Sequence, residues 1–431
     1  MKHHVSAAAV FIVVTVAFSA VFAIYWKGLL GKPDGKAGPM KGGGGGAPPP
    51  PLVGLRNVTV TTLAGPLPRT GHASEGGWVD AQGPAARFDG PSAVAALATG
   101  ELWVTDSRNH RLRRIGPDGT VATLAGSGPG SATVGACVDG AADAARLWNP
   151  SGVVASPGGN VYFTDTGNHR VRSLVGGQVR LLAGGDTPLD AFGLPAGSLQ
   201  DGPGATARFR YPVGIALRSD GVLLVVDTGN RRVRAIAPDG TTSTFADLAS
   251  AGAKSPCGIA LAPDGRVLIA DPAAREIFVI APDRTVAPLA GVRKGDPFWG
   301  APTGVAVSPQ GVIYVADTGS HSILRINPGA APQLLAGTVA LPVASPGFVD
   351  GAGDKAQFAV PSGIAIDAAG ALYVADYGNN AIRKLLIGPE IPPPRPRRAR
   401  SAGGAAKGGG PPARRPGPPN PPSAGGAPPA H

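Results

Sequence analysis

The chain has 431 residues, including 66 glycines and 46 prolines, and its formal net charge is +11. The charge lies mainly at the ends: residues 1–51 hold five lysines and one aspartate, and residues 389–431 hold six arginines, one lysine and one glutamate. The middle is therefore nearly neutral, which argues against a basic nucleic-acid-binding face on a folded domain. Cys137 and Cys257 are too few for a disulfide framework and lack metal-ligand spacing, although one disulfide between them stays open.

The N-terminus begins with an apolar run at residues 5–26, interrupted by only three hydroxyl residues. About 20 apolar residues suffice to cross a bilayer as a helix, and Tyr25 and Trp26 stand where interfacial aromatic residues are typical. We therefore predict a transmembrane signal anchor at residues 1–26. A cleaved signal peptide is the alternative, because Val-Phe-Ala at residues 21–23 resembles a cleavage site.

Two segments contain almost no apolar residues, and both are predicted to be disordered: a Gly/Pro-rich linker at residues 27–51 and a basic tail at residues 389–431. By the positive-inside rule, the linker lysines favour a cytoplasmic domain. The signal-like start and the Gly/Pro linker favour export, and we expect the domain to be extracytoplasmic. The tail is either solvated or a charged polyproline segment that contacts anionic lipid, cell-wall polymer or nucleic acid.

Between these segments, residues 52–388 repeat one phrase six times: an apolar run, an aspartate and a tight polar turn, as in VYFTDTGNHRVRSL. Each repeat is predicted to form four strands. The first follows a proline, the second ends in the repeated aspartate, and the fourth resembles TVATLAG. The third alternates arginine with aliphatic residues, which predicts one solvent-exposed face. The repeated aspartates are Asp106, Asp165, Asp227, Asp271, Asp317 and Asp376.

A copy of the fourth strand stands out of place in this pattern. It occurs at residues 58–63, before the first repeat, and no copy follows the sixth repeat. The economical explanation is that this strand pairs with the last blade and closes a ring, which removes exposed sheet edges. The sequence therefore predicts an all-β, six-bladed β-propeller that is closed by an N-terminal strand.

The run Asp-Thr-Gly-Asn-His-Arg-Val-Arg at residues 165–172 resembles the NHL repeat, which is named after an Asn-His-Leu triplet at this place. Residues 106–114 and 317–325 are similar. The third repeat has Arg231 in place of the histidine, the sixth has Asn380, and the fourth departs most. The resemblance implies a six-bladed propeller and leaves the ligand open, because fold and function separate easily.

The polar residues of the repeats are interpreted as structural. Each repeated aspartate is expected to accept hydrogen bonds from turn N–H groups two residues further on. His110, His169 and His321 occupy equivalent points on separate blades, so they cannot bind one metal ion.

Six-bladed relatives include calcium-dependent lactonases and esterases and zinc-dependent amidating lyases. The resemblance to them implies carboxylates, asparagines or histidines at the starts of the inner strands, around the central channel. The residues at these positions here are Ser92, Ser151, Val213, Cys257, Thr303 and Ser362. None of them is an acid or a histidine, so the sequence predicts no metal site and no cofactor.

Four repeats carry an insertion that starts with an aspartate and has an arginine or glutamine seven residues later. The pairs are Asp80 and Arg87, Asp139 and Arg146, Asp201 and Arg208, and Asp350 and Gln357. One interpretation is structural: the next residue, Phe or Leu, plugs the blade and the arginine pairs with a repeated aspartate. The other is a binding rim on a rigid scaffold. The candidate binding residues of that rim are Arg87, Arg146, Trp148, Arg208 and Tyr211.

The sequence as a whole predicts a single-pass, membrane-tethered, non-enzymatic binding scaffold. Its loop face would engage a protein or a glycan, and no nucleic-acid partner is expected. The alternative is a propeller-type hydrolase or lyase whose channel site the residues do not reveal. The heavy use of Ala, Gly, Pro and Arg is typical of a GC-rich bacterial genome.

Overall fold

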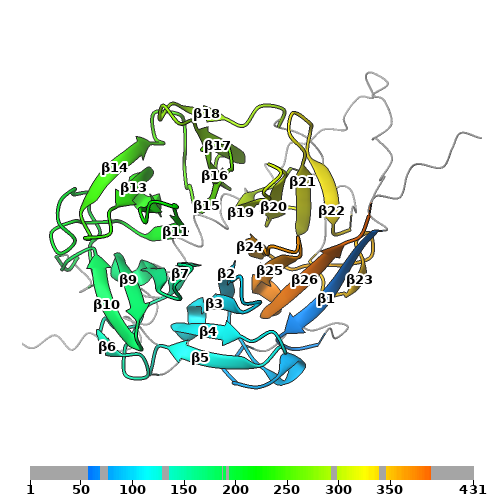
Figure 1. Cartoon of the computed structure of the whole chain (residues 1–431), viewed down its shortest axis with the longest axis horizontal. Coiled ribbons are helices and arrows are strands. Elements are labelled where there is room, and N and C mark those ends of the chain that lie inside the picture. The colour runs from blue at the N-terminus through cyan, green and yellow to red at the C-terminus, as the bar shows by residue number, and fades with distance from the viewer. Residues whose placement is uncertain are drawn as a thin grey trace, which may run out of the picture. The chain divides into compact units, whose positions relative to one another are not determined.

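Six antiparallel sheets are arranged as blades around a central axis (Figure 1). The computed structural model describes residues 57–67, 76–128, 135–186, 188–190, 194–292, 299–338 and 346–389. These residues contain no α-helix, and no helix among them is long and apolar enough to cross a membrane. The predicted anchor and the two predicted disordered segments fall almost entirely outside them.

Each of the first three blades has four main strands, which follow one another from the channel outward. Blade 1 consists of β2 (Pro91–Ala96), β3 (Leu102–Asp106), β4 (Arg111–Ile115) and β5 (Val121–Ala125). Blade 2 consists of β7 (Pro150–Ala155), β8 (Val161–Asp165), β9 (Arg170–Val175) and β10 (Gln178–Ala183), with the short edge strand β6 (Gly140–Ala141). Blade 3 consists of β11 (Pro212–Leu217), β12 (Leu223–Asp227), β13 (Arg232–Ile236) and β14 (Thr242–Asp247).

The last three blades repeat this order. Blade 4 consists of β15 (Gly258–Leu261), β16 (Val267–Asp271), β17 (Glu276–Ile280) and β18 (Val286–Pro288). Blade 5 consists of β19 (Pro302–Val307), β20 (Ile313–Asp317), β21 (Ser322–Ile326) and β22 (Gln333–Ala336). Blade 6 consists of β24 (Pro361–Ile366), β25 (Leu372–Asp376), β26 (Ala381–Ile387), β1 (Val58–Ala64) and the edge strand β23 (Gly351–Ala352). The predicted six-bladed, all-β architecture is confirmed.

The N-terminal strand closes the ring, as predicted. Strand β1 pairs antiparallel with β26, in a register that runs from Val58 opposite Ile387 to Ala64 opposite Ile382. The side chains of Val58, Val60 and Ala64 are fully buried. The first and the last described strands of the chain therefore share one blade.

The hydrophobic core lies between blades rather than within them. Each of six clusters of buried side chains combines residues from two neighbouring blades. One of them joins Phe163 of blade 2 to Trp103 of blade 1, and another joins Val58 of blade 6 to Tyr314 of blade 5. Because each blade buries its two faces against its neighbours, the closed ring stabilises every blade.

Glycines allow the inner strands to meet at the channel. A Cβ atom at Gly152 would lie 2.2 Å from the carbonyl oxygen of Val213 in the next blade, and one at Gly214 would lie 2.2 Å from that of Cys257. This close approach of two backbones excludes a side chain and explains the repeated Pro-x-Gly starts. The proline fits there because the first residue of a strand need not donate to the sheet.

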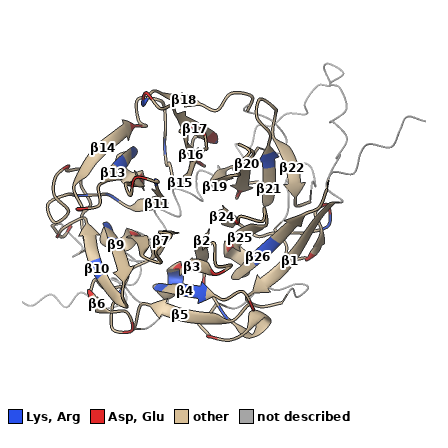
Figure 2. Cartoon of the chain, in the orientation of Figure 1, with Lys and Arg blue, Asp and Glu red and all other residues tan. Residues whose placement is uncertain are grey.

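The third strands differ from their prediction. The face that carries their arginines was expected to be exposed to solvent. In four blades, however, one arginine of the third strand has a fully buried side chain: Arg113, Arg172, Arg234 and Arg383. Figure 2 shows basic residues on three of these strands, β4, β13 and β26. The insertions cover these arginines, because they add an outer edge to the same four blades. The added edge consists of β6, β23 and the isolated bridges Gln82–Thr120 and Gly202–Thr242.

Candidate functional site

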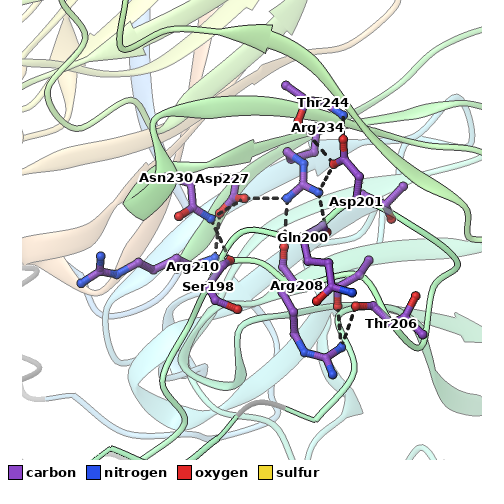
Figure 3. Close-up of polar contacts among 12 residues, drawn as sticks. Ser198, Gln200, Asp201, Thr206, Arg208, Arg210, Asp227, Asn230, Arg234 and Thr244 are labelled. Atoms are coloured by element: carbon purple, nitrogen blue, oxygen red, sulfur yellow. Dashed lines mark hydrogen bonds and ion pairs between the residues drawn. The ribbon is translucent and has the colours of Figure 1, made fainter.

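Within a blade, a buried arginine ties the insertion to the repeated aspartate, as Figure 3 shows for blade 3. Arg234 Nη1 donates hydrogen bonds to Asp227 Oδ2 at 2.9 Å and to the carbonyl of Arg208 at 2.9 Å. Its Nη2 donates to the carbonyl of Gln200 at 2.8 Å and to the carboxylate of Asp201. One guanidinium therefore holds two carboxylates and two main-chain carbonyls together.

The surroundings of this arginine complete the fixed unit. The backbone N–H of Thr244 donates to Asp201 Oδ2 at 3.0 Å, which attaches the insertion to the outer strand. The Arg234 guanidinium lies 4.9 Å from the centre of the Phe209 ring, within the range of a cation–π contact. Phe209 is fully buried, as the blade-plug interpretation expected.

The same unit recurs wherever an insertion is present. Arg113, Arg172 and Arg383 make the corresponding contacts with the repeated and the insertion aspartates in blades 1, 2 and 6. Blades 4 and 5 have no such aspartate insertion, and Phe278 and Leu324 stand at the arginine position. Arginine and insertion thus occur together, because a buried guanidinium requires the acceptors that the insertion provides.

The turn partners of the repeated aspartates lie three residues further on rather than the predicted two, and in blades 4 and 5 they are backbone N–H groups, as predicted. Asp227 accepts from the side chain of Asn230, three residues further on, and from the backbone N–H of Arg210 in the segment before the inner strand. In blade 5, Asp317 accepts the backbone N–H groups of Gly300, Ala301 and Ser320 instead. The aspartate therefore joins its turn to the inner strand of its own blade.

Burial and the hydrogen-bond partners shift the pKa of the repeated aspartates in opposite directions. Burial raises the pKa of Asp106 to about 6, although the guanidinium of Arg113 and the amide of Asn109 oppose the shift. The group remains mainly ionised at neutral pH. Its charge is balanced within the ion pair with Arg113, whose Nη1 lies 2.7 Å from Asp106 Oδ2.

The insertion arginines named by the sequence do not pair with the repeated aspartates. Arg87 Nη1 donates to the carbonyls of Pro84 and Ala86, both at 2.7 Å. Arg208 likewise donates to carbonyls of its own loop, at 2.9 to 3.1 Å. The sequence could not distinguish them from the third-strand arginines, because both kinds lie near an aspartate along the chain.

The histidine of the NHL turn connects neighbouring blades. Nδ1 of His169 accepts the backbone N–H of Tyr211 at 2.8 Å, and Nδ1 of His321 accepts that of Val360 at 3.1 Å. Asn380 takes this role in blade 6, where its Oδ1 accepts the N–H of Gly90 at 2.8 Å. An acceptor at this position therefore links each of these turns to the residue that precedes the inner-strand proline of the next blade.

This link predicts a pH-dependent stability. Nε2 of His169 donates to the carbonyl of Pro195, so protonation would place a second proton on Nδ1, opposite the N–H of Tyr211. Burial lowers the pKa of His169 from 6.5 to about 4. Because the folded-state pKa is depressed, the stabilisation is present above pH 6.5 and is lost as the pH falls toward 4.

The variant His169→Asn tests this link, since asparagine keeps the acceptor, as Asn380 does, and does not titrate. Between about pH 7.5 and pH 5, the wild-type free energy of unfolding should fall by about 2 kcal/mol more than that of the variant. Denaturant unfolding at both pH values measures the difference. Other titrating groups, such as Asp106, are common to both proteins and cancel. Equal losses would show that His169 does not control this pH dependence.

A cavity of about 280 Å³ lies where the six inner strands begin. All six inner-strand positions named by the sequence line it: Ser92, Ser151, Val213, Cys257, Thr303 and Ser362. Because strands alternate in direction within a blade, the turns after the repeated aspartates and the starts of the inner strands lie on one face of the ring. We call this the Asp-turn face, and the cavity lies at its centre.

Of the five candidate binding residues, the structure brings two to this cavity. Trp148 and Tyr211 line it, whereas Arg87, Arg146 and Arg208 do not. The lining also includes residues that sequence reasoning missed, such as Arg108 and Tyr377. Their position in the sequence could have indicated this location, because both residues follow a repeated aspartate by one or two places.

Most hydroxyl groups at the cavity are already engaged. Ser107 Oγ donates to the carbonyl of Pro150 at 2.5 Å, Thr166 Oγ1 to that of Pro212 at 2.5 Å, and Thr318 Oγ1 to that of Pro361 at 2.6 Å. These bonds join blade 1 to blade 2, blade 2 to blade 3 and blade 5 to blade 6 around the channel. No group of three or more His, Cys, Asp or Glu residues within the described part of the chain could hold a metal ion.

The cysteines do not form a disulfide. Cys137 is exposed and Cys257 is buried, and neither is joined in a disulfide. Cys257 lies at the cavity, with its Sγ 3.4 Å from the carbonyl oxygen of Thr303. The disulfide that the sequence left open is therefore absent from this structure.

The closed ring of six sheets, four with four strands and two with five, defines the protein as a six-bladed β-propeller. The NHL repeat pattern matches four segments of it, residues 88–115, 147–172, 301–326 and 358–385, which lie in blades 1, 2, 5 and 6. The chain is therefore a six-bladed β-propeller that contains four NHL repeats. Blades 3 and 4, which lack the histidine of the repeat, are not among the matched segments.

Curated relatives resemble only part of this chain. The chloroplastic protein SUPPRESSOR OF QUENCHING 1 of Arabidopsis thaliana is 31% identical over 83 residues, or 19% of this chain and 7% of that protein. Teneurin-3 of Danio rerio is 32% identical over 97 residues, or 20% of this chain and 4% of that protein. The match thus spans well under a tenth of either relative.

Solved structures resemble this chain over a larger share of its length. A structural-genomics protein of unknown function from Bacteroides thetaiotaomicron has a TM-score of 0.56 and 19% identity, with 76% of this chain and 75% of that chain covered. An auxiliary nutrient binding protein from Bacteroides ovatus has a TM-score of 0.56 and 15% identity, with 77% of each chain covered. At such identities the likeness concerns the fold alone.

Proposed function

We propose that this protein is a membrane-tethered, non-enzymatic binding scaffold whose Asp-turn face holds a protein or glycan partner. The observation that carries the proposal is the cavity at the centre of this face, with Trp148 and Tyr211 in its wall. Aromatic residues in concave, well-packed sites are the usual anchors of binding. A nutrient-binding role is named for one neighbour of the same fold, which is compatible with such a scaffold.

The rigidity of this face supports the proposal. Each repeated aspartate fixes its own turn, and in blades 1, 2 and 5 a histidine and a hydroxyl also fix that turn to the next blade. Loops held in this way lose little conformational entropy when a partner binds. The charged unit around Arg234 and its equivalents is therefore support for the binding face rather than a part of it.

The binding test compares two variants of the cavity wall with a matched aromatic control. Trp148→Ala and Tyr211→Ala should each weaken partner binding tenfold or more, about 1.4 kcal/mol or more. Trp78→Ala should leave it unchanged, because Trp78 is exposed and does not line the cavity. Partners are captured by crosslinking in intact cells, and their affinity is then measured with purified full chain. Equal loss in all three variants, or in none, would contradict the proposed site.

The proposed tether is the apolar run at residues 5–26, followed by a linker of 25 residues. A flexible coil of this length reaches about 25–30 Å on average, so the partner should lie near the membrane. We expect the propeller on the extracytoplasmic side. External protease should then cut the linker in intact cells while a cytosolic control protein stays whole. Cleavage only after lysis would place the propeller in the cytoplasm.

A further inference from the structure

The cavity is small and its wall is largely apolar. Its volume of about 280 Å³ is at the lower limit of ordinary ligand sites, which span roughly 300–1,000 Å³. This volume accommodates a single ring rather than an oligosaccharide. Val213, Ile215 and Ile259 contribute aliphatic surface, and Trp148 and Tyr211 contribute aromatic surface.

The polar groups of the wall are poorly suited to a sugar. A sugar needs several donors and acceptors that are free to meet its hydroxyls, because a buried polar group without a partner costs about 1–3 kcal/mol. The hydroxyls of Ser107, Thr166 and Thr318 already donate to carbonyls of the next blade. An apolar ring makes no such demand, so the wall favours it over a glycan.

A strained backbone position shapes the mouth of the cavity. The residue before the inner-strand proline has a φ of 50° at Tyr211 and 55° at Val360, and both residues line the cavity. A β-branched residue such as Val360 is rare in this left-handed region, where a non-glycine residue costs about 1–2 kcal/mol. Such strain is typical of binding sites, where the side chain is retained for its contacts.

The rim of the cavity carries one charged side chain. Arg108 is the only Lys, Arg, Asp or Glu residue among the described residues that line the cavity. Its side chain is 52% exposed, lies 5.6 Å from the centre of the Tyr377 ring, and contacts Asp89 at 3.4 Å. An exposed pair at this distance is weak, so the guanidinium can also donate hydrogen bonds to an incoming carboxylate.

From these observations we infer that the cavity receives one aromatic side chain of a protein partner, with a carboxylate next to that side chain facing Arg108. The inference rests on the proposed binding function and selects a protein partner over a glycan. Trp148 and Tyr211 form the wall against the ring. Val360 limits the size of the ring.

The test uses the full chain in detergent and observes small probes by saturation-transfer NMR. The probes are N-acetylphenylalanine, N-acetylphenylalaninamide and N-acetylglucosamine. Ser362→Leu fills the cavity from the inner strand, where Val213 and Cys257 show that apolar side chains fit, and Ser362→Val is the milder form. Because every variant sits in the same detergent, signal from probes dissolved in micelles is subtracted. An unchanged melting temperature shows that each variant folds.

We expect ring protons of N-acetylphenylalanine to be saturated in the wild type and to lose this signal in Ser362→Leu. The amide should bind roughly three- to tenfold more weakly than the acid, and Arg108→Gln should abolish that difference. N-acetylglucosamine should give no signal that depends on the cavity. Trp78→Ala should behave as the wild type.

Three results would overturn the inference. Cavity-dependent signal from N-acetylglucosamine would assign the site to sugars and leave the proposed binding function standing. Identical signals from the wild type and both Ser362 variants would show that the cavity takes no ring, even if partner capture still depends on Trp148. Identical signals together with partner capture that ignores Trp148 and Tyr211 would contradict the proposed function as well.

Discussion

Replacing Arg234 by leucine is expected to lower the free energy of unfolding by about 3–5 kcal/mol, because the change leaves a buried carboxylate without its cationic partner. Arg234 is fully buried, and Asp227 beside it is fully buried as well. Leucine would also remove one of the two donors from each of the carbonyls of Arg208 and Gln200. Denaturant unfolding of the purified protein measures the loss.

A matched arginine on the surface provides the control. Arg218 also pairs with an aspartate, Asp220, at 2.8 Å, but its side chain is 42% exposed. Arg218→Leu should therefore change the free energy of unfolding by about 1 kcal/mol or less. The double change Arg234→Leu with Asp227→Asn should recover part of the loss, because it removes the unpaired charge. A loss for Arg234→Leu no larger than that for Arg218→Leu would show that the buried pair does not stabilise the blade.

The second large effect is expected at the closing strand. Val60 and Thr61 are neighbours on β1, but Val60 is fully buried and Thr61 faces solvent. Val60→Asp places a charge in the core between blades 5 and 6 and should lower the free energy of unfolding by several kcal/mol, on the order of 4. Thr61→Asp should shift it by about 0.5 kcal/mol or less.

Deleting residues 58–64 extends this test from one side chain to the whole strand. The deletion exposes the edge of β26, so the protein should melt at a much lower temperature and should associate through that edge. Calorimetry and light scattering follow the two effects. A deletion protein that melts like the wild type as a monomer would show that the ring does not need this closure.

Much of the fold follows from the sequence because its signals are local. The repeated phrase around Asp165 gives the strand order within a blade, and the misplaced strand at residues 58–63 gives the closure. The inner-strand positions around the channel follow as well, because symmetry-related residues of a ring must converge. Each of these steps needs only the period of the repeat and the alternation of apolar residues.

The third strand shows where local signals fail. Alternating arginine and aliphatic residues normally indicate one wet face, yet Arg234 is buried. Its partner Asp201 lies 33 residues away, in an insertion that folds back over the outer edge of the blade. The periodicity of a strand carries no information about a loop that covers it, so the exposed face was predicted incorrectly.

The candidate site was predicted only in part for the same kind of reason. Trp148 and Tyr211 reach the cavity, while Arg87 and Arg208 turn back to carbonyls of their own loops. In the sequence all four belong to the same insertion pattern. Which of them reach the cavity depends on the directions of their side chains, and the backbone sets these directions. At Tyr211, for example, the backbone φ is 50°.

The sequence by itself determined the number of blades, the order of strands and the strand that closes the ring, because repeat period and apolar alternation are properties of neighbouring residues. Only the tertiary structure decided which arginine neutralises the buried aspartates, which residue links one blade to the next, and which side chains enclose the cavity. Those choices depend on contacts between segments tens of residues apart, such as Tyr211 with His169. They are fixed by the geometry of packed blades, which no local pattern records.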